Sequence, residues 1–219
     1  MEPSSRKVVH RSPAHTVRSL NLPHLQPEPI EADSSVERDF VHCAALFPAV
    51  TSISSQPFQL TLPIGKYTPD YLVRFADGSR AVVEVKPEEF IADFQQKFDQ
   101  ARLKLAEFGM PFLLARDTVL RREGLADRAL FVRRYAKGGA SVNDIRRCLE
   151  LLESAGEALS MKELREAGIP RSTILLMVTR RQLLISADLQ YDDDAKVQFF
   201  SQTELGERHA IRFANWLDA

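Results

Sequence analysis

The chain has 219 residues, of which 44% are hydrophobic and 27% charged, which is typical of a globular protein with one large domain or two small ones. Its net charge of -1 excludes the overall positive field of a general nucleic-acid binder. No apolar run is long enough for a membrane span or a signal peptide, and Cys43 and Cys148 are isolated, so we expect a reducing cytoplasm.

Residues 1–30 are rich in proline and contain more basic than acidic residues. Because they show little apolar periodicity, we predict an extended arm without a packed core of its own. Such an arm either lies along DNA or a partner, or is a tail without fixed structure.

A helix is predicted to begin near Ser34, because apolar residues follow at helical spacing: Val36, Phe40, Cys43, Ala44 and Phe47. Ser34 and Glu37 fit a capping box, in which a serine is followed three residues later by a glutamate. Short strands are predicted next at residues 50–56 and 58–62.

The stretch from Tyr67 to Lys86 predicts a β-hairpin, with strands at residues 69–75 and 79–86 and a turn at Ala76-Asp77-Gly78. If Gly78 adopts a left-handed conformation, the register places Asp70 opposite Glu84. Side chains alternate along a strand, so Glu84 and Lys86 share one face. The hairpin therefore gathers two carboxylates and one ammonium group at the end away from its turn.

These three side chains have the chemistry of a metal-assisted phosphate site. Carboxylate oxygens are ligands that Mg²⁺ prefers, and the ammonium group of Lys86 can steady the charge that develops on a phosphate. The alternative is a solvated strand face. The apolar residues of the second strand argue against that alternative, because an unpaired charge in a buried strand is costly: Val82, Val83 and Val85.

After the hairpin, a helix is predicted from Pro87 to Gly109, followed by a strand at residues 110–115. The apolar face of the helix comprises Phe90, Phe94, Phe98, Ala101, Leu105 and Phe108. Helix, hairpin, helix and strand in this order indicate an α/β fold with a mixed sheet flanked by helices.

Residues 116–137 form the most basic segment, which we place on a helix. A solvated helix face is the usual interpretation of such charge, and contact with the DNA backbone is the alternative. The candidates for that contact are Arg121, Arg122, Arg128, Arg133 and Arg134.

Gly138-Gly139 is the best domain boundary, so we expect one domain at residues 31–137 and a second at 138–219. The second domain is mostly helical and resembles a winged helix. Its predicted elements are helices at 141–152, 160–168, 171–182 and 204–217, and wing strands at 183–189 and 196–200. Its third helix is aliphatic and its acidic residues outnumber its basic ones, so we favour docking to a partner protein over reading of bases.

Pro69-Asp70 followed by Glu84-Val85-Lys86 resembles the PD-(D/E)xK motif of restriction-endonuclease-like nucleases. The stretches SSVERDF, QPF, YTPDYLV and VVEVKP resemble a TnsA-type endonuclease, the nuclease subunit of heteromeric cut-and-paste transposases. The resemblance implies a restriction-endonuclease-like sheet and a catalytic site of Glu37, Asp70, Glu84 and Lys86, in which the three acids hold Mg²⁺ or Mn²⁺. Capping and metal coordination are both open as roles of Glu37, and they are compatible. Some members of the family have glutamine where this chain has Glu84.

By this resemblance, the protein is expected to hydrolyse the 5′, non-transferred strand of double-stranded DNA at transposon ends. A TnsB-like DDE transposase would cut and join the 3′ ends, and a TnsC-like AAA+ ATPase would regulate both. The expected location is the bacterial cytoplasm, at the nucleoid when the enzyme is active. Two alternatives are a stand-alone restriction or repair nuclease of the same fold, and a catalytically silent adaptor with that fold.

Overall fold

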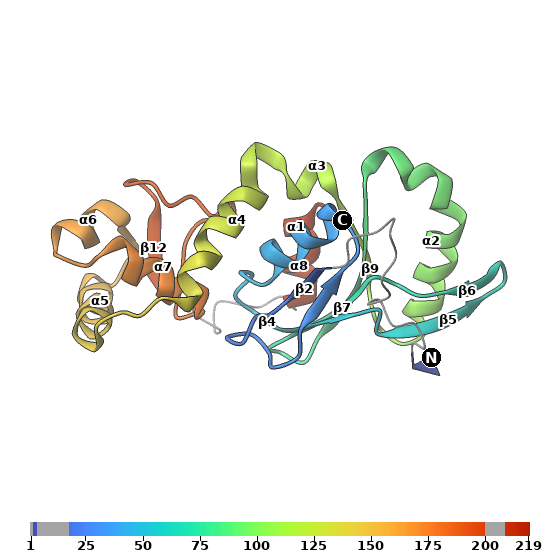
Figure 1. The fold of residues 1–219 in the computed structure, drawn as a ribbon, viewed down its shortest axis with the longest axis horizontal. Helices are drawn as coiled ribbons and strands as arrows, with labels where there is room; N and C mark the ends of the chain where they lie inside the picture. Colours follow the sequence, from blue (N-terminus) through green and yellow to red (C-terminus); the bar gives the residue numbers. More distant parts are fainter. Residues whose placement is uncertain (1, 4–17, 200–208) are drawn as a thin grey trace. The chain divides into compact units, whose positions relative to one another are not determined.

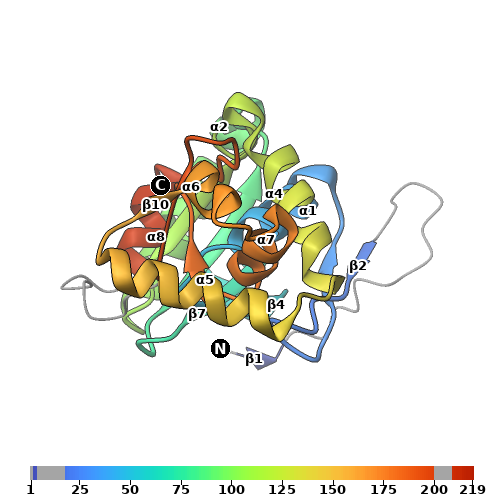
Figure 2. The same cartoon turned by 90° about the vertical axis from the view of Figure 1, so that its left-hand side faces the viewer.

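The computed structural model describes residues 2–3, 18–199 and 209–219. The chain forms two compact units, whose ribbons are shown in Figures 1 and 2. The first unit runs to Arg122 and also contains the C-terminal helix α8 (His209–Leu217), and the second begins at Glu123. Half of the predicted N-terminal arm, residues 1 and 4–17, lies outside the described residues, and in the described half Leu22 and Ile30 are buried.

The boundary between Arg122 and Glu123 differs from the expected domain boundary, which lies between residues 137 and 138. The segment between Glu123 and Lys137 packs against helix α7 (Arg171–Thr179) of the second unit, so it does not belong to the nuclease-like unit. Helix α8 instead contacts strand β9 (Phe112–Arg116) of the first unit. Both differences arise from contacts between segments that are distant in the sequence.

The first unit is built around a four-stranded sheet with the order β4-β7-β8-β9. Neighbouring strands are antiparallel except β8 and β9, which are parallel, so the sheet is mixed as expected. The strands other than β9 are β4 (Val50–Ser55), β7 (Tyr71–Phe75) and β8 (Arg80–Lys86).

The hairpin of β7 and β8 has the predicted register. Gly78 is left-handed with φ 79°, and its N–H donates to the carbonyl of Phe75 at 3.0 Å. Tyr71 pairs with Val83. This pairing confirms the predicted register, in which Asp70, just before β7, lies opposite Glu84. A glycine is needed in this turn because other residues rarely adopt positive φ.

Helix α2 (Ile91–Ala106) covers one face of the sheet and follows a short 3-10 helix, η1 (Glu88–Phe90). The core under α2 contains Leu72, Val82, Phe98, Ala101, Leu105 and Phe112. The predicted apolar face is too long, because Phe90 and Phe108 lie beyond the ends of α2 and are 46% and 42% exposed.

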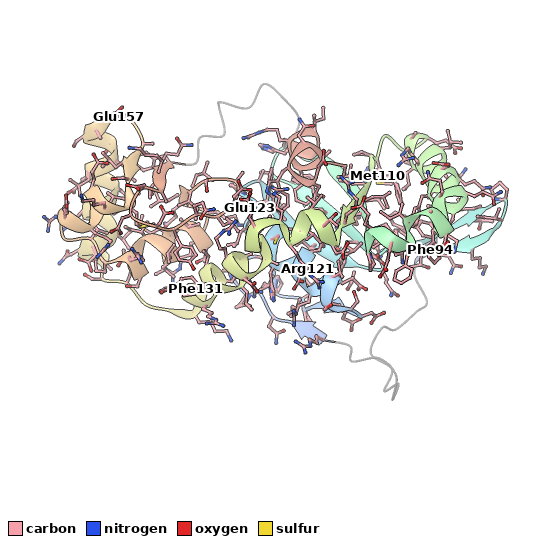
Figure 3. The ribbon with its side chains drawn as sticks, turned by 90° about the horizontal axis from the view of Figure 1, so that it is seen from above. Phe94, Met110, Arg121, Glu123, Phe131 and Glu157 are labelled. Atoms are coloured by element: carbon pink, nitrogen blue, oxygen red, sulfur yellow. The ribbon has the colours of Figure 1, made fainter. Side chains whose placement is uncertain are left out.

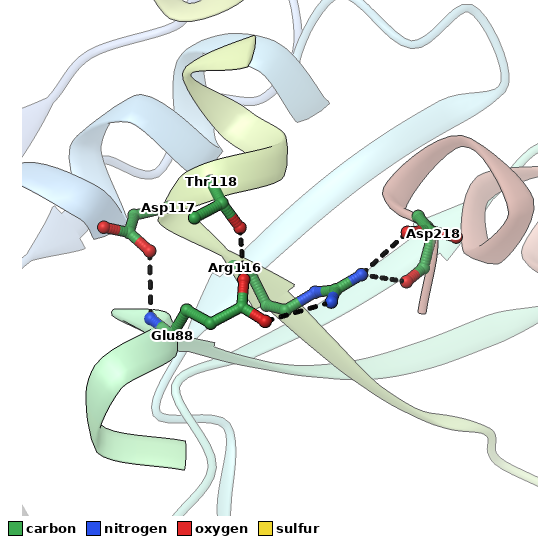
Figure 4. Close-up of polar contacts among 5 residues, drawn as sticks. All are labelled: Glu88, Arg116, Asp117, Thr118 and Asp218. Carbon is green, nitrogen blue, oxygen red and sulfur yellow. Dashed lines mark hydrogen bonds and ion pairs between the residues drawn. The ribbon is translucent and has the colours of Figure 1, made fainter.

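Helices α1 (Ser35–Ala44) and α8 cover the opposite face of the sheet, as Figure 1 shows. The ring of Phe213 on α8 lies 5.3 Å from that of Phe75, and the ring of Phe40 on α1 lies 5.1 Å from that of Tyr71. The end of α8 is tied to β9 by Arg116, which bonds the Asp218 carboxylate at 2.8 Å and pairs with Glu88 at 3.3 Å (Figure 4).

Shorter strands extend the first unit. A three-stranded sheet has the order β1-β5-β6, with β1 (Glu2–Pro3), β5 (Phe58–Leu62) and β6 (Gly65–Tyr67). Strands β2 (Arg18–Leu20) and β3 (Ile30–Ala32) form an antiparallel pair. The sequence did not predict β6, a three-residue strand with two exposed residues whose pairing to β5 supplies its order.

The basic segment is interrupted rather than forming the single predicted helix. It contains α3 (Asp117–Leu120), η2 (Arg122–Gly124), α4 (Leu125–Arg134) and η3 (Tyr135–Lys137). Glu123 and Gly124 have φ of 46° and 78°, and left-handed residues cannot continue an α-helix.

The second unit contains helices and a small antiparallel sheet with the order β10-β12-β11. Besides α4, η3 and α7, its elements are α5 (Val142–Ala155), β10 (Leu159–Ser160), α6 (Met161–Glu166), β11 (Leu183–Leu184) and β12 (Lys196–Phe199). The predicted two-stranded wing is wrong in detail, because β10 joins it as a third strand and β11 is shorter than residues 183–189. Part of the predicted helix at 204–217 lies outside the described residues. Within those residues, no helix has both the length and the apolar character that a membrane span requires.

Candidate active site

The open end of the β7-β8 hairpin brings Asp70 next to the end of β8. The Asp70 carboxylate accepts a hydrogen bond of 2.8 Å from the backbone N–H of Val85. Asp70 directly precedes β7, and Val85 follows Glu84 on β8. The bond therefore holds the Asp70 side chain close to Glu84. The two acids of the motif therefore lie close together at one end of the sheet, Glu84 on β8 and Asp70 just before β7.

Glu84 is 5% exposed and has a partner at each carboxylate oxygen. Its Oε2 accepts a hydrogen bond of 2.6 Å from the Tyr67 hydroxyl, and its Oε1 lies 3.5 Å from the Lys86 ammonium nitrogen. Burial raises the pKa of Glu84, while the Tyr67 hydroxyl and the Lys86 charge act in the opposite direction. A buried carboxylate is tolerated here because it is hydrogen-bonded and paired.

Asp70 is in a more strongly negative environment. Its pKa is raised well above the ordinary value, first by burial and then by the charges of Glu84 and Glu37. The Val85 N–H and the Lys86 charge lower the pKa but do not offset these effects. Carboxylates whose charges raise the pKa of a neighbouring acid in this way favour the approach of a cation.

The donor set of Asp70 and Glu84 fits Mg²⁺, which proteins commonly hold with one or two carboxylates plus phosphate oxygens and water. In the part of the chain that the structure describes, no group of three or more His, Cys, Asp or Glu side chains is arranged to hold a metal ion. The two carboxylates fit that donor set in number and type.

Glu37 lies at the start of α1, where its carboxylate contacts the helix terminus. Its Oε1 accepts from the Ser34 hydroxyl at 3.0 Å and its Oε2 from the Asp33 N–H at 2.9 Å. Ser34 caps the helix by accepting from the Glu37 N–H, as predicted, but the carboxylate reaches Asp33 rather than the Ser34 backbone. The Tyr71 hydroxyl lies 3.4 Å from Glu37, and the charge of Glu37 raises the pKa of Asp70. Glu37 is therefore a capping residue that also acts electrostatically on the site.

Lys86 connects the acids to helix α2. Its side chain is 25% exposed, and its ammonium nitrogen lies 4.9 Å from the centre of the Phe94 ring. Figure 3 labels Phe94 on α2. A carboxylate and an aromatic ring therefore hold the ammonium group of Lys86 at the edge of the site, in a position that a phosphate can reach.

The arginines predicted to contact DNA are divided between the two units. Arg121 pairs with Asp39 at 2.8 Å and Arg122 donates to the Trp216 carbonyl at 3.2 Å, both within the first unit. In the second unit, Arg128 donates to the Asp188 carbonyl at 2.7 Å. These contacts show that much of the basic segment has a structural role.

The other two predicted arginines differ in burial. Burial lowers the pKa of Arg133 to about 10, whereas Arg134 is exposed. The predicted basic segment therefore does not present its arginines as one exposed helix face.

Tyr67, Tyr71 and Phe94 were not among the predicted site residues. Tyr67 belongs to the unpredicted strand β6, so the sequence pattern offered no reason to direct its hydroxyl at Glu84. The start of the YTPDYLV stretch is the one signal that could have pointed to it.

A mixed sheet with an acid on each arm of a hairpin and a lysine beside them has the architecture of an α/β nuclease domain. Residues 47–117 match the family model "TnsA-like endonuclease N terminal". The match confirms the resemblance to a TnsA-like endonuclease subunit and indicates a nuclease related to transposition. It includes Asp70, Glu84 and Lys86 and leaves out Glu37. A comparison with curated proteins finds no match.

Proposed function

We propose that this protein is a magnesium-dependent endonuclease that hydrolyses the 5′, non-transferred strand at transposon ends. It acts with a TnsB-like DDE transposase and a TnsC-like AAA+ ATPase in cut-and-paste transposition. The observation that carries this proposal is the meeting of Asp70, Glu84 and Lys86 at one end of the sheet, within the segment that matches the TnsA-like model.

Each residue of the site has a distinct role in this proposal. Asp70 and Glu84 hold the metal, Mg²⁺ or Mn²⁺, and Tyr67 keeps the Glu84 carboxylate in position. When bound, the metal supplies a Lewis acid that polarises the phosphate oxygens. Lys86 contacts the scissile phosphate and stabilises the negative charge that increases there as the bond breaks.

The second unit is proposed to dock to a partner protein as a winged-helix-like domain. Its helix α7 is almost entirely buried, which leaves few side chains for reading bases. Together with a net charge of -1, this supports a nuclease that stays idle until its partners deliver DNA. Strong nicking of an arbitrary plasmid by the purified chain alone would contradict that part of the proposal.

Strand-specific mapping of breaks at transposon ends tests the function. Wild type, Asp70→Ala and Lys86→Ala are each assayed with the companion proteins, with and without Mg²⁺. Asp99→Asn and Lys104→Met are the matched controls, because both residues lie on α2 with half-exposed side chains outside the site. We expect 5′-strand breaks with wild type and both controls in Mg²⁺, and none with either site variant although the complex still assembles.

Other outcomes select the alternatives. Unchanged 5′-strand breaks with Asp70→Ala and Lys86→Ala support a silent adaptor, because another protein then makes the cut. Full cleavage by the chain without companion proteins supports a stand-alone nuclease. Either result overturns the proposed function.

A further inference from the structure

A second lysine contacts the aromatic ring that touches Lys86. The ammonium nitrogen of Lys97 lies 5.4 Å from the centre of the Phe94 ring, and that of Lys86 lies 4.9 Å from the same centre. Lys97 is three residues after Phe94 on α2, so the two side chains are neighbours on the helix surface. The ring therefore brings two cations together, one from the sheet and one from the helix.

The two cations differ in their partners. Lys86 has Glu84 at 3.5 Å, whereas no ion pair or hydrogen bond is described for the Lys97 side chain within the residues that the structure covers. Lys104, on the same helix, also lies over a ring, that of Phe108 at 5.9 Å, but it pairs with Glu107 at 2.6 Å. A contact with an aromatic face is weak compared with a charged partner.

Two like charges at one ring repel each other, and an anion that contacts both removes this repulsion. The anion that belongs at Lys86 is a DNA phosphate, if the proposed function holds. A DNA strand carries a phosphate about every 3.4 Å along the helix axis, so a strand with one phosphate at Lys86 has others close by. Lys97 is half-buried, and its ammonium group contacts the same Phe94 ring that contacts Lys86 at the site.

We propose that Lys97 binds the DNA backbone at a phosphate next to the one that is cut, and thereby positions the strand for Lys86. This inference rests on the proposed function, because it takes the strand at Lys86 to be the substrate. Lys97 acts as a positioning residue: it contacts the substrate backbone but takes no part in breaking the bond.

The test measures binding of the full chain to a fluorescein-labelled DNA duplex by anisotropy, in EDTA so that no cleavage occurs, over a range of NaCl concentrations. The proteins are wild type, Lys97→Ala, Lys97→Arg and the matched control Lys104→Ala. Loss of one phosphate contact reduces the slope of log affinity against log salt by about one. Thermal unfolding of each variant is measured in parallel, and we expect all to unfold near the wild-type temperature.

We expect Lys97→Ala to lose about three- to tenfold in affinity and about one unit of slope. Lys97→Arg should restore both, and Lys104→Ala should match wild type. A wild-type slope for Lys97→Ala, or equal losses in Lys97→Ala and Lys104→Ala, overturns the inference. So does a wild-type chain that fails to bind DNA at any salt concentration.

Cleavage by the same proteins with the companion proteins and Mg²⁺ separates this inference from the proposed function. If wild type cleaves but Lys97→Ala binds and cleaves like wild type, the inference fails and the proposed function stands. If wild type does not cleave while Lys97→Ala still loses slope, the proposed function fails and the phosphate contact stands.

Discussion

The hydroxyl of Tyr67 donates a hydrogen bond of 2.6 Å to Oε2 of the buried Glu84 carboxylate. Tyr67 comes from β6, at the edge of a separate sheet, whereas Glu84 lies on the central strand β8. The bond occupies one oxygen and leaves Oε1 toward Lys86 at 3.5 Å. The three-stranded sheet therefore sets the orientation of a carboxylate in the four-stranded sheet.

Replacing Tyr67 with phenylalanine tests this relationship. We expect Tyr67→Phe to lower the free energy of unfolding by about 1.5–3 kcal/mol, because a charged acceptor loses its buried donor. Cleavage should fall as well, since Glu84 is then free to turn. Tyr135→Phe is the control, because Tyr135 belongs to the second unit, where its ring packs against that of Phe131. Urea denaturation and single-turnover cleavage measure both effects, and an equal loss of cleavage in the two variants would contradict the assignment.

Glu37→Gln separates the two roles of Glu37. Glutamine also serves in a capping box, so this variant should keep its stability within about 0.5 kcal/mol, whereas Glu37→Ala should lose about 1 kcal/mol. If the charge of Glu37 serves the site, Glu37→Gln should cut about ten- to hundredfold more slowly. Thermal unfolding measures the change in stability, and single-turnover assays measure the change in cleavage rate. Full activity of Glu37→Gln would restrict Glu37 to capping.

The C-terminal helix should be needed for stability of the nuclease unit. Phe213 is fully buried, and its ring lies 5.1 Å from that of Phe47 and 5.3 Å from that of Phe75. We expect Phe213→Ala to cost about 3–5 kcal/mol through the cavity that it leaves. Ile211→Ala on the same helix is the control, because Ile211 is 49% exposed, and it should cost far less. Equal unfolding midpoints in urea for the two variants would show that α8 does not stabilise the unit.

Attachment of α8 should also weaken in acid. Slight burial raises the pKa of Asp77, but hydrogen bonds from the Ser79 hydroxyl and from the His209 and Ser79 N–H groups outweigh it and lower the pKa overall. A lowered folded-state pKa means that the stabilisation is complete above the unfolded-state pKa, about 3.9, and is lost as pH falls through the folded-state value.

The unfolding temperature of wild type should therefore fall more steeply than that of Asp77→Asn between about pH 5 and pH 3. Scanning calorimetry at several pH values makes the comparison, and other acids titrate in both proteins, so the difference isolates Asp77. Parallel curves would rule out a contribution of this carboxylate.

The hairpin register was predictable because it depends on local features. A turn at Asp77-Gly78 and alternation along two short strands are enough to place Asp70 near Glu84. The Ser34 cap was predictable for the same reason, since its partner lies three residues away.

The predictions that differ from the structure concern contacts between distant segments. Pairing of β5 with β6 places Tyr67 in the site. Helix α8 belongs to the first unit, although the sequence predicts it as part of the second domain with α5, α6 and α7. The break at Glu123 and Gly124 falls inside a segment whose apolar spacing predicts a continuous helix, and the positive φ of these two residues is not encoded in that spacing.

The α/β class, the motif hairpin and the acids and lysine that it carries were predictable from local patterns, because turn residues and the two-residue period of a strand act over short distances. The groups that surround those side chains depend on the folded chain: the Tyr67 hydroxyl that bonds Glu84, the Phe94 ring that contacts both Lys86 and Lys97, and helix α8 packed against the sheet. These contacts arise when separate elements pack to bury apolar surface, and local periodicity does not specify which elements meet.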